Sequence, residues 1–499
     1  MHSSLLILAA VGGLFVRGSS AIFNFFPDAK NFIYIVPDGF GPASQTLARD
    51  YVSLLQHGED PKNHVSIELP ADKLVIGNVR TFSGDNLITD SAASATAFAC
   101  GVKTQNGVIG LDKTGQPVGS ILEAAHLAGM KTGLVVTSTI THATPAGYVA
   151  HIASRGAEDK IAEQELGYSH PLGSVVDILM GGGRCYFVPK QAEGSCRNDD
   201  LDLLKWAKQK GWSVITDRAG FDNLRKGSKA TLPYIGLFND GMMQYELDRD
   251  PAKEPSLVEM VETALNSLKK ATRFSPRGYF LMIEASRIDH AGHANDAAGH
   301  LHDIIQYNEV VDFVRKWIDK NPDTLMLSAA DHETGGLTLD GYNPLPLKGA
   351  KNTTEVLAPL FADYDGDDAA GLLRDTILPA YGITDASDKE IESLIALKGK
   401  SSFANALGNI LADRAGISWT TGGHSAIDVT LLGYGWRHKG EELKREMAGN
   451  WDNTELPKYI EGALKVSLDK ATKALRKGGS DWVPRSISEK RSEDYHHLH

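Results

Sequence analysis

Acidic and histidine side chains occur in this sequence at spacings that suit a metal ion. Asp289 and His293 are four residues apart. Asp331 is followed directly by His332, and the small neighbours of His424 leave room for a cation to approach. Carboxylate oxygens and imidazole nitrogens are the ligands that zinc and harder divalent cations use in proteins. Each of these side chains alone is more often a helix cap, a surface residue or a core residue, but together they predict a metal site.

Ser91 is the candidate nucleophile. It follows Asp90, and the alanine-rich run 92–100 favours a helix that ends at Gly101. The amide groups and the dipole at such a helix N-terminus favour phosphate oxygens. The alternative is that Ser91 or Asp90 only caps the helix, which is the commoner use of these residues. With the metal ligands and Arg155 as a candidate phosphate clamp, Ser91 indicates metal-assisted phosphoryl transfer.

These side chains follow apolar runs that are typical of buried β-strands. Asp38, Glu284 and Asp331 each stand at the end of one such run. Helical patterns, for example residues 120–128 and 302–320, alternate with the runs. This alternation predicts an α/β fold, a large and mainly parallel sheet with helices on both faces, whose functional residues gather at the carboxyl ends of the strands. The expected strands are residues 31–37, 74–79, 132–137, 175–180, 279–283, 324–329 and 426–432.

Charge and composition limit the partners. The 499 residues carry a formal net charge of -12 and contain no run of lysine and arginine. A net negative surface opposes nonspecific binding of nucleic acid, so we expect no nucleic-acid-binding module. The 50 glycines suit many tight turns between strands and loops.

The first 21 residues are typical of a secretory signal peptide. Residues 5–16 are apolar but too few to span a bilayer, and the small residues 19–21 fit a cleavage site. A packed first helix and an uncleaved anchor are the alternatives. Residues 488–499 are charged and rich in histidine, which excludes a hydrophobic anchor signal there. We therefore expect a secreted protein without a membrane span, or one in the lumen of the vacuole or another secretory compartment.

The cysteines and the one glycosylation sequon agree with export. Cys185 and Cys196 flank a short loop and could form a disulfide in an oxidising compartment. Cys100 is interpreted as a buried free thiol. Asn352 begins an Asn-Thr-Thr sequon, which can be used only in the secretory pathway.

Taken together, the motifs resemble those of the alkaline phosphatases. The resemblance covers about residues 30–436, and the gaps between motifs are closest to those of fungal and animal members. It implies a catalytic domain over residues 30–436, with a surface insertion at about 340–413, and a charged helical tail over 437–499. The matching motifs are Asp38-Gly39, TDSAASATA at 89–97, GVKTQNGVIG at 101–110, residues 143–155, Glu284 with Ile288 to His293, Asp331-His332, and TGGHSAIDV at 421–429.

The resemblance also implies a reaction and the ligands that support it. Phosphate monoesters of many alcohols would be hydrolysed through a phosphoserine on Ser91, with Arg155 as the phosphate clamp. Two zinc ions and one magnesium ion would assist, inorganic phosphate would be bound and released, and the protein would be a homodimer. The implied ligands are Asp289, His293 and His424 for the first zinc ion, Asp38, Asp331, His332 and the Ser91 oxygen for the second, and Asp38, Thr144 and Glu284 for magnesium.

The sequence departs from the family pattern at positions near these ligands. His142 stands where bacterial members often carry aspartate, and His290 where they often carry lysine. These exchanges would alter the charge around the third metal and the release of phosphate. Residues 236–239 and 249–250 resemble part of the calcium site of animal members, but Asn239 stands where an acid is usual, so calcium is doubtful.

Three other functions compete with this interpretation. A sulfatase would need a cysteine or serine in a C/S-x-P-x-R motif, which the stretch around Ser91 lacks. A phosphodiesterase or nucleotide pyrophosphatase of the same superfamily would use a similar two-zinc site, but such enzymes usually have a threonine nucleophile and lack counterparts of Glu284 and Arg155. A zinc- or phosphate-binding protein without catalytic activity would not need Ser91, Arg155 and the complete ligand set together.

Overall fold

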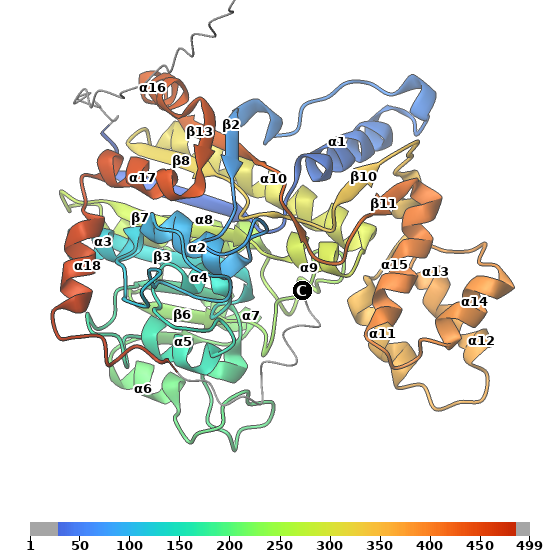
Figure 1. Cartoon of the computed structure of the whole chain (residues 1–499), viewed down its shortest axis with the longest axis horizontal. Helices are drawn as coiled ribbons and strands as arrows, with labels where there is room; N and C mark the ends of the chain where they lie inside the picture. Colours follow the sequence, from blue (N-terminus) through green and yellow to red (C-terminus); the bar gives the residue numbers. More distant parts are fainter. Residues whose placement is uncertain (1–27, 486–499) are drawn as a thin grey trace, which may run out of the picture.

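The apolar runs form the strands of one ten-stranded sheet (Figure 1). The computed structural model describes residues 28–485, so the predicted signal peptide and residues 488–499 lie outside the described part of the chain. β1 (Asn31–Pro37), β7 (Tyr279–Ala285) and β8 (Thr324–Ser328) are buried along their whole length, as expected for strands covered on both faces. The remaining strands of the sheet are β2 (Val75–Arg80), β3 (Lys131–Thr139), β4 (Ile178–Gly182), β5 (Ser213–Ile215), β6 (Tyr234–Leu237), β13 (Val429–Gly435) and β14 (Gly449–Asp452).

The sheet is mainly parallel. Its order is β14-β2-β13-β8-β1-β7-β3-β4-β6-β5, and only β13 runs antiparallel to its neighbours β2 and β8. All seven predicted runs contribute strands, with ends that differ by up to three residues, and the α/β fold class is confirmed. β5, β6 and β14 were not predicted because three or four residues give too short a pattern to recognise.

Helices cover both faces of the sheet. α8 and α10 pack against each other on one face, while α2, α3 and α17 pack together on the other. The predicted capping box of α3 is present, because Ser120 Oγ accepts the amide of Glu123 and the Glu123 carboxylate accepts the amide of Ser120. The helices are α1 (Pro42–His57), α2 (Ser91–Cys100), α3 (Ile121–Leu127), α4 (Ala143–Ala146), α5 (Glu158–Glu165), α6 (Leu203–Gln209), α7 (Arg218–Asn223), α8 (Leu257–Ala271), α9 (Arg287–His293), α10 (Ala297–Lys320), α11 (Thr354–Ala362), α12 (Ala369–Leu372), α13 (Leu378–Ala380), α14 (Asp388–Ile395), α15 (Ser402–Ala415), α16 (His438–Met447), α17 (Leu456–Leu464) and α18 (Leu468–Arg476).

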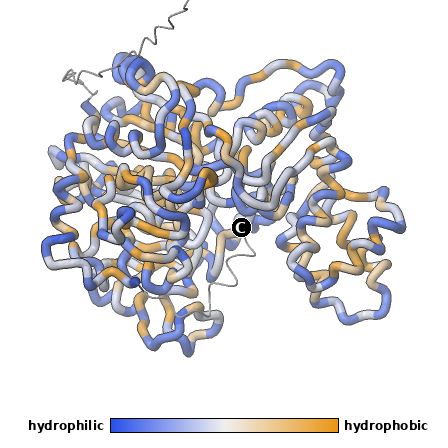
Figure 2. The backbone as a smooth tube through the Cα atoms, in the orientation of Figure 1, coloured by the Kyte–Doolittle hydropathy of each residue, from blue (hydrophilic) through white to orange (hydrophobic). Residues whose placement is uncertain are grey.

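The predicted insertion forms a helical lobe beside the body that carries the sheet. It contains α11 to α15 and is drawn in orange in Figure 1. Figure 2 shows apolar stretches inside this lobe as well as in the body, and Phe361 stacks on Phe403 with 4.9 Å between ring centroids. The short strands β10 (Leu337–Leu339) and β11 (Ile417–Trp419) pair antiparallel and close the base of the lobe. Within the lobe, the short segment between α11 and α12 is an acidic surface loop.

The chain after residue 436 packs against the same sheet and its helices. β14 extends the sheet beyond β2, and the side-chain amide of Asn453 donates from Nδ2 to Ser94 Oγ of α2. α17 packs on α2 and α3. β14 has four residues and no apolar run, so the sequence did not indicate this strand. Among the described residues, no helix has the length and apolar character needed to cross a bilayer.

Candidate active site

Three acids meet at the carboxyl ends of adjacent central strands. Asp38 follows β1, Glu284 lies near the end of β7, and Asp331 comes shortly after β8. The order β8-β1-β7 places these strand ends side by side, and all three side chains are fully buried. The parallel register therefore concentrates carboxylates at one edge of the sheet.

Ser91 faces this group from the N-terminus of α2. Asp90 caps the helix by accepting the amide of Ala93, at 2.9 Å, and Gly101 ends the helix with a φ of 73°. Ser91 Oγ lies 3.1 Å from His332 Nε2. The two interpretations of this motif therefore hold for two different residues. Asp90 caps the helix, and the Ser91 hydroxyl points at the predicted ligands.

Arg155 reaches the same place from the loop that follows α4. Its Nη1 lies 3.2 Å from Asp90 Oδ2, and its Nη2 lies 3.2 Å from His142 Nε2. The side chain is only slightly exposed, so its guanidinium is held beside Ser91 and not in bulk water. The arrangement suits a clamp for a tetrahedral anion.

Asp289, His293 and His424 form a second group of ligand atoms. His424 is brought there by the pairing of β12 (His424–Ser425) with β9 (Glu333–Thr334). His293 Nδ1 donates to the carbonyl of Gly422 at 2.6 Å, and His424 Nδ1 donates to the carbonyl of Thr89 at 2.8 Å. The two Nε2 atoms lie 3.1 Å apart, and Asp289 Oδ2 lies 3.3 Å from His293 Nε2. Because both Nδ1 atoms donate to backbone carbonyls, the Nε2 atoms are the ones left to face Asp289 and to bind a cation.

The third group contains Asp38, Glu284 and the imidazole of His142. The hydroxyls of Ser138 and Ser286 donate to Glu284 Oε2, at 3.1 and 2.8 Å. Glu284 Oε1 and both carboxylate oxygens of Asp38 are buried without a hydrogen bond from any described residue. Buried carboxylate oxygens rarely lack partners, so these three atoms fit metal ligands.

Burial and charge shift the pKa values of this site in opposite directions. Burial and the neighbouring Asp331 raise the pKa of Asp38 well above its usual value. Burial raises the pKa of Glu284 to about 7, although a hydrogen bond from Ser286 opposes the rise. Burial would also raise the pKa of Asp289, but the charge of His293 outweighs it and holds that pKa well below the usual value. Asp38 and Glu284 therefore need divalent cations to be stable as anions, whereas Asp289 does not.

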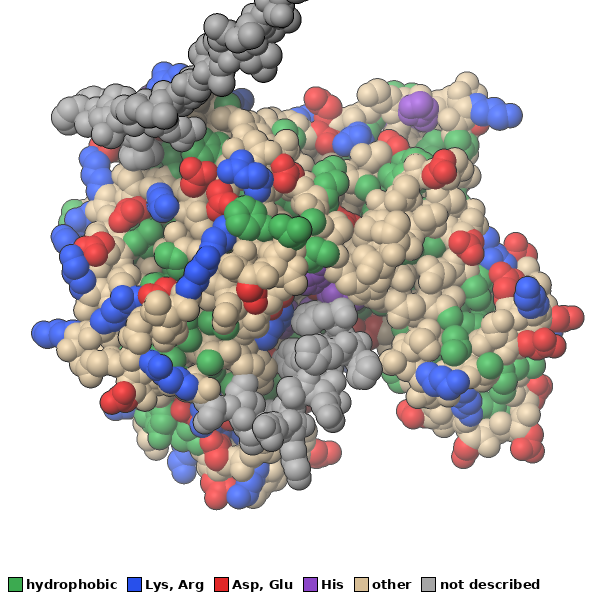
Figure 3. Space-filling model, in the orientation of Figure 1, with side chains coloured by type: hydrophobic (Ala, Val, Ile, Leu, Met, Phe, Trp, Pro, Cys, Tyr) green, Lys and Arg blue, Asp and Glu red, His purple; other side chains and the backbone are tan. Residues whose placement is uncertain are grey.

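The remaining predicted site residues lie close to this centre or apart from it. Thr144 is buried in α4 beside Glu284. The ring of His290 lies 5.5 Å from that of His142, and its Nδ1 lies 3.1 Å from Arg287 Nη1. Figure 3 shows histidine side chains in the recess between the body and the helical lobe.

The calcium motif does not converge in the structure. Asn239 donates to Glu254 Oε1, while Asp250 pairs with Lys253. Asp250 belongs to no group of three or more acidic, histidine or cysteine ligands among residues 28–485. Elsewhere, Cys185 and Cys196 form a disulfide with Cα atoms 4.9 Å apart, and Cys100 is a buried free thiol. Asn352 is half-buried, and its Nδ2 donates to Asp248 Oδ1 at 3.3 Å.

Sequence reasoning missed the hydroxyl groups that hold the acids. Ser286 could have been found, because it lies two residues after Glu284 at the end of a strand, where alternate residues share a side. Thr334 Oγ1 donates to Asp289 Oδ1 at 2.5 Å and lies 3.2 Å from His332 Nδ1. It carries no comparable signal, because its role depends on the fold of the segment between β8 and β10.

Comparisons with known proteins agree with this geometry. The alkaline phosphatase family matches residues 29–466 of the chain. An alkaline phosphatase of Schizosaccharomyces pombe is 41% identical over 460 residues, which cover 90% of this chain and 83% of the relative. The repressible alkaline phosphatase of Saccharomyces cerevisiae is 39% identical, with coverage of 94% and 88%. The crystal structure of Thermus thermophilus alkaline phosphatase is similar to this structure with a TM-score of 0.75 at 28% identity, covering 90% of this chain and 96% of that one.

Proposed function

The chain belongs to the alkaline phosphatase family of phosphomonoester hydrolases, and we propose that it acts through a phosphoserine intermediate on Ser91. The observation that carries the proposal is the position of Ser91 Oγ. It lies at a helix N-terminus, beside His332 Nε2 and next to buried carboxylate oxygens without hydrogen bonds. A serine that only capped its helix would not need such surroundings.

The donor atoms suit three divalent cations. When bound, the cations would lower the pKa of the Ser91 hydroxyl and neutralise charge on the phosphoryl group. Mixed nitrogen and oxygen donors favour zinc at the first two sites, and the oxygen donors of the third site favour magnesium. The ligands would be Asp289, His293 and His424 at the first site, Asp38, Asp331, His332 and Ser91 at the second, and Asp38, Thr144 and Glu284 at the third.

The side chains of this chain then account for both chemical steps. The Ser91 hydroxyl gives its proton to water, Ser91 Oγ forms a bond to phosphorus while the ester bond to the alcohol breaks, and the alcohol leaves with a proton taken from water. A water molecule next attacks the phosphoserine and gives up a proton, while Ser91 Oγ departs from inorganic phosphate and regains a proton from solvent. Arg155 can hold two non-bridging oxygens throughout, since its planar fork matches their spacing. These contacts address the phosphoryl group, so we expect a broad range of leaving alcohols.

The test is a pair of assays on metal-loaded protein at pH about 9, where a metal-activated hydroxyl is ionised. One substrate is p-nitrophenyl phosphate and the other is bis-p-nitrophenyl phosphate, each with and without a chelator. Strong preference for the monoester, abolished by chelation, is expected. Preference for the diester would assign the chain to the phosphodiesterase branch, and no activity on either with metal still bound would indicate a binding protein.

We also infer that the protein is a secreted or lumenal homodimer. The Cys185–Cys196 disulfide is typical of oxidising compartments, and the Asn352 sequon lies at the start of the helical lobe. Sedimentation would give the oligomeric state, and the mass change after enzymatic deglycosylation would test the sequon.

A further inference from the structure

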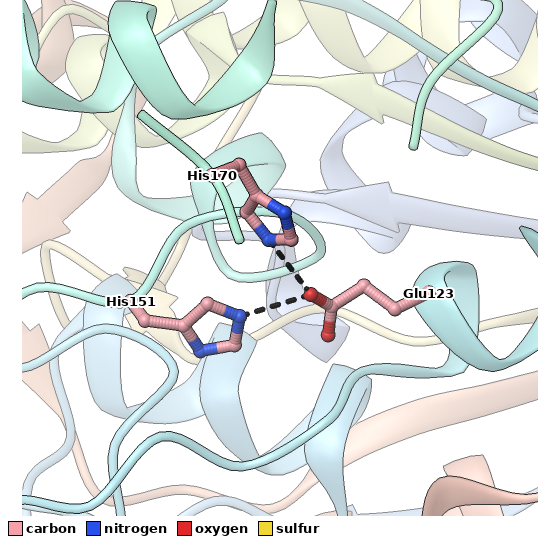
Figure 4. A group of neighbouring side chains, drawn as sticks. All are labelled: Glu123, His151 and His170. Atoms are coloured by element: carbon pink, nitrogen blue, oxygen red, sulfur yellow. Dashed lines mark hydrogen bonds and ion pairs between the residues drawn. The ribbon is translucent and has the colours of Figure 1, made fainter. Parts of the chain in front are cut away.

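A second acid–histidine group lies buried away from the candidate metal centre (Figure 4). Glu123 of α3 points at the rings of His151 and His170, which come from separate loops. Glu123 Oε1 is 3.0 Å from His151 Nε2 and 2.9 Å from His170 Nε2. All three side chains are shielded from solvent. Their proximity alone would fit a metal site, so the hydrogen bonds decide what the group is.

Hydrogen bonds satisfy this group completely without a cation. The amide of Leu172 donates to His170 Nδ1 at 3.2 Å, so His170 carries its proton on Nε2 and donates it to Glu123. His151 Nδ1 donates to the carbonyl of Gly110 at 2.8 Å, and its Nε2 faces the same carboxylate. Both ring nitrogens of His151 therefore have a partner supplied by the chain, as both nitrogens of His170 do. A metal on His170 Nε2 would require the other tautomer, which the Leu172 amide opposes.

His151 is joined through short backbone contacts to the loop that carries Arg155. Ile109 and Ile152 exchange two backbone hydrogen bonds, of 3.0 and 2.9 Å. The amide of Arg155 donates to the carbonyl of Gly107 at 2.8 Å, and the amide of Gly107 donates to Asp90 Oδ2, also at 2.8 Å. Segment 107–110 thus connects the Arg155 loop to the cap of the nucleophile helix.

Gly110 shows how tightly His151 is held against this segment. Its φ is 63°, and a Cβ atom there would lie 2.6 Å from His151 Nδ1. Only glycine allows the backbone and the imidazole to approach so closely.

Trp482 covers the group from the C-terminal segment. Its ring centroid lies 5.4 Å from that of His151 and 5.8 Å from that of His170. Two residues later, the carbonyl of Pro484 accepts the amide of Ala153 at 3.3 Å. The segment after α18 therefore contacts both the imidazoles and the Arg155 loop.

We propose that His151 is a positioning residue for Arg155. Glu123, His170 and Trp482 hold the imidazole, its Nδ1 holds segment 107–110 against residues 150–155, and this fixes the guanidinium where phosphate binds. The inference rests on the proposed role of Arg155 in binding phosphate.

Two substitutions of His151 separate its two hydrogen bonds. An asparagine amide can reproduce the Nδ1 donor to Gly110, whereas a glutamine amide can reproduce the Nε2 donor to Glu123. H151Q should raise the Kd for inorganic phosphate and the KM for p-nitrophenyl phosphate about tenfold, as one lost charge-assisted hydrogen bond would. H151N should change both less, but should lower the melting temperature more, because it removes one of the two hydrogen bonds that buried Glu123 Oε1 accepts, whereas H151Q keeps it.

A double-mutant cycle tests whether the effect passes through Arg155. In the R155A background, H151Q should no longer change phosphate affinity. An unchanged tenfold effect in that background, or equal KM values for H151N and H151Q, would overturn the proposal and leave a purely structural role. Loss of one metal equivalent per chain in H151Q, measured by elemental analysis, would also overturn it and assign a metal site.

A second substitution keeps the test valid if the His151 variants do not fold. W482L should raise the phosphate Kd with little change in kcat, whereas W436L, at a half-buried tryptophan near the end of β13, should not. Equal phosphate affinity in the two variants would contradict the proposal. Phosphate affinity is measured by calorimetry on the full chain, so it remains informative even if the wild-type protein hydrolyses no monoester, which would overturn the proposed function instead.

Discussion

Two buried groups of acids and histidines in this protein differ in how their polar atoms are satisfied. In the Glu123 group, each ring nitrogen and each carboxylate oxygen has a hydrogen-bonding partner supplied by the chain. In the candidate metal centre, Glu284 Oε1 and both oxygens of Asp38 have none among the described residues. Similar residue types at similar distances therefore serve different purposes. Whether the chain supplies partners for the polar atoms, and not the clustering of acids and histidines, indicates which group is suited to cations.

The two groups also differ in the charge that surrounds their carboxylates. Burial raises the pKa of Glu284 to about 7. Glu123 is equally buried, yet the adjacent His151 and His170 lower its pKa to about 2. The Glu123 group contains its own counter-charge, whereas the metal centre depends on cations from solution.

The largest expected effect tests the chemistry of the metal centre without changing its charge. Ser91→Ala should leave the metal content nearly unchanged and lower kcat about a thousandfold or more, because the covalent path is lost. Elemental analysis and steady-state kinetics on p-nitrophenyl phosphate measure both. Turnover close to that of the wild type would remove Ser91 from the nucleophile role.

Removal of the phosphate clamp should have a smaller effect. Arg155→Ala should raise KM roughly 10- to 100-fold and lower kcat less than loss of a zinc ligand does, since charge-assisted hydrogen bonds are lost. Asp331→Asn serves as the comparison for a lost ligand. If neither constant changed in Arg155→Ala, the guanidinium would not contact the substrate.

A matched pair of substitutions compares the two groups directly in metal-free protein. At pH 7, Glu123→Gln should lower the free energy of unfolding by about 3 kcal/mol, because it removes the buried carboxylate that both imidazoles contact. Glu284→Gln should not lower it and should raise it, because an uncompensated buried carboxyl is removed. Chemical denaturation after chelation measures both. Equal destabilisation by the two substitutions would show that the groups do not differ in charge balance.

The pH dependence of stability should have opposite slopes for the two groups. The pKa of Glu284 is raised from 4.5 to about 7, so metal-free protein should lose stability as pH rises through this interval. The pKa of Glu123 is lowered from 4.5 to about 2, so its contribution is complete above pH 4.5 and is lost as pH falls towards 2. Denaturation curves of the Gln variants and the wild type should isolate each slope, and each slope should vanish in the corresponding variant. The same sign for both would refute the comparison.

Much of the fold, and the convergence of the acids in the candidate metal centre, could be predicted because local signals were strong. Long apolar runs identified the buried strands, and parallel strands place their carboxyl ends at one edge, so Asp38, Glu284 and Asp331 had to lie near one another. The alanine-rich run between Asp90 and Gly101 identified α2 with both of its ends correct.

Other features could not be predicted because they depend on contacts between distant segments. The pairing of β9 with β12 brings His424 to His293, and β14 joins the sheet through four mostly polar residues. His142 was expected beside the third site, but its contact with Arg155 Nη2 follows from how the loop after α4 packs. The helical lobe buries its own apolar residues. The sequence did not indicate this packing, because an acidic loop lies between two of the helices.

The sequence by itself determined which chemistry this protein carries, because residue types and their order along the strands are local properties. Only the tertiary structure decided which acids receive hydrogen bonds from the chain and which keep oxygens for cations. That distinction separates Glu123 from Glu284, and it arises because donors such as His151 and His170 come from loops that pack together only in the folded molecule.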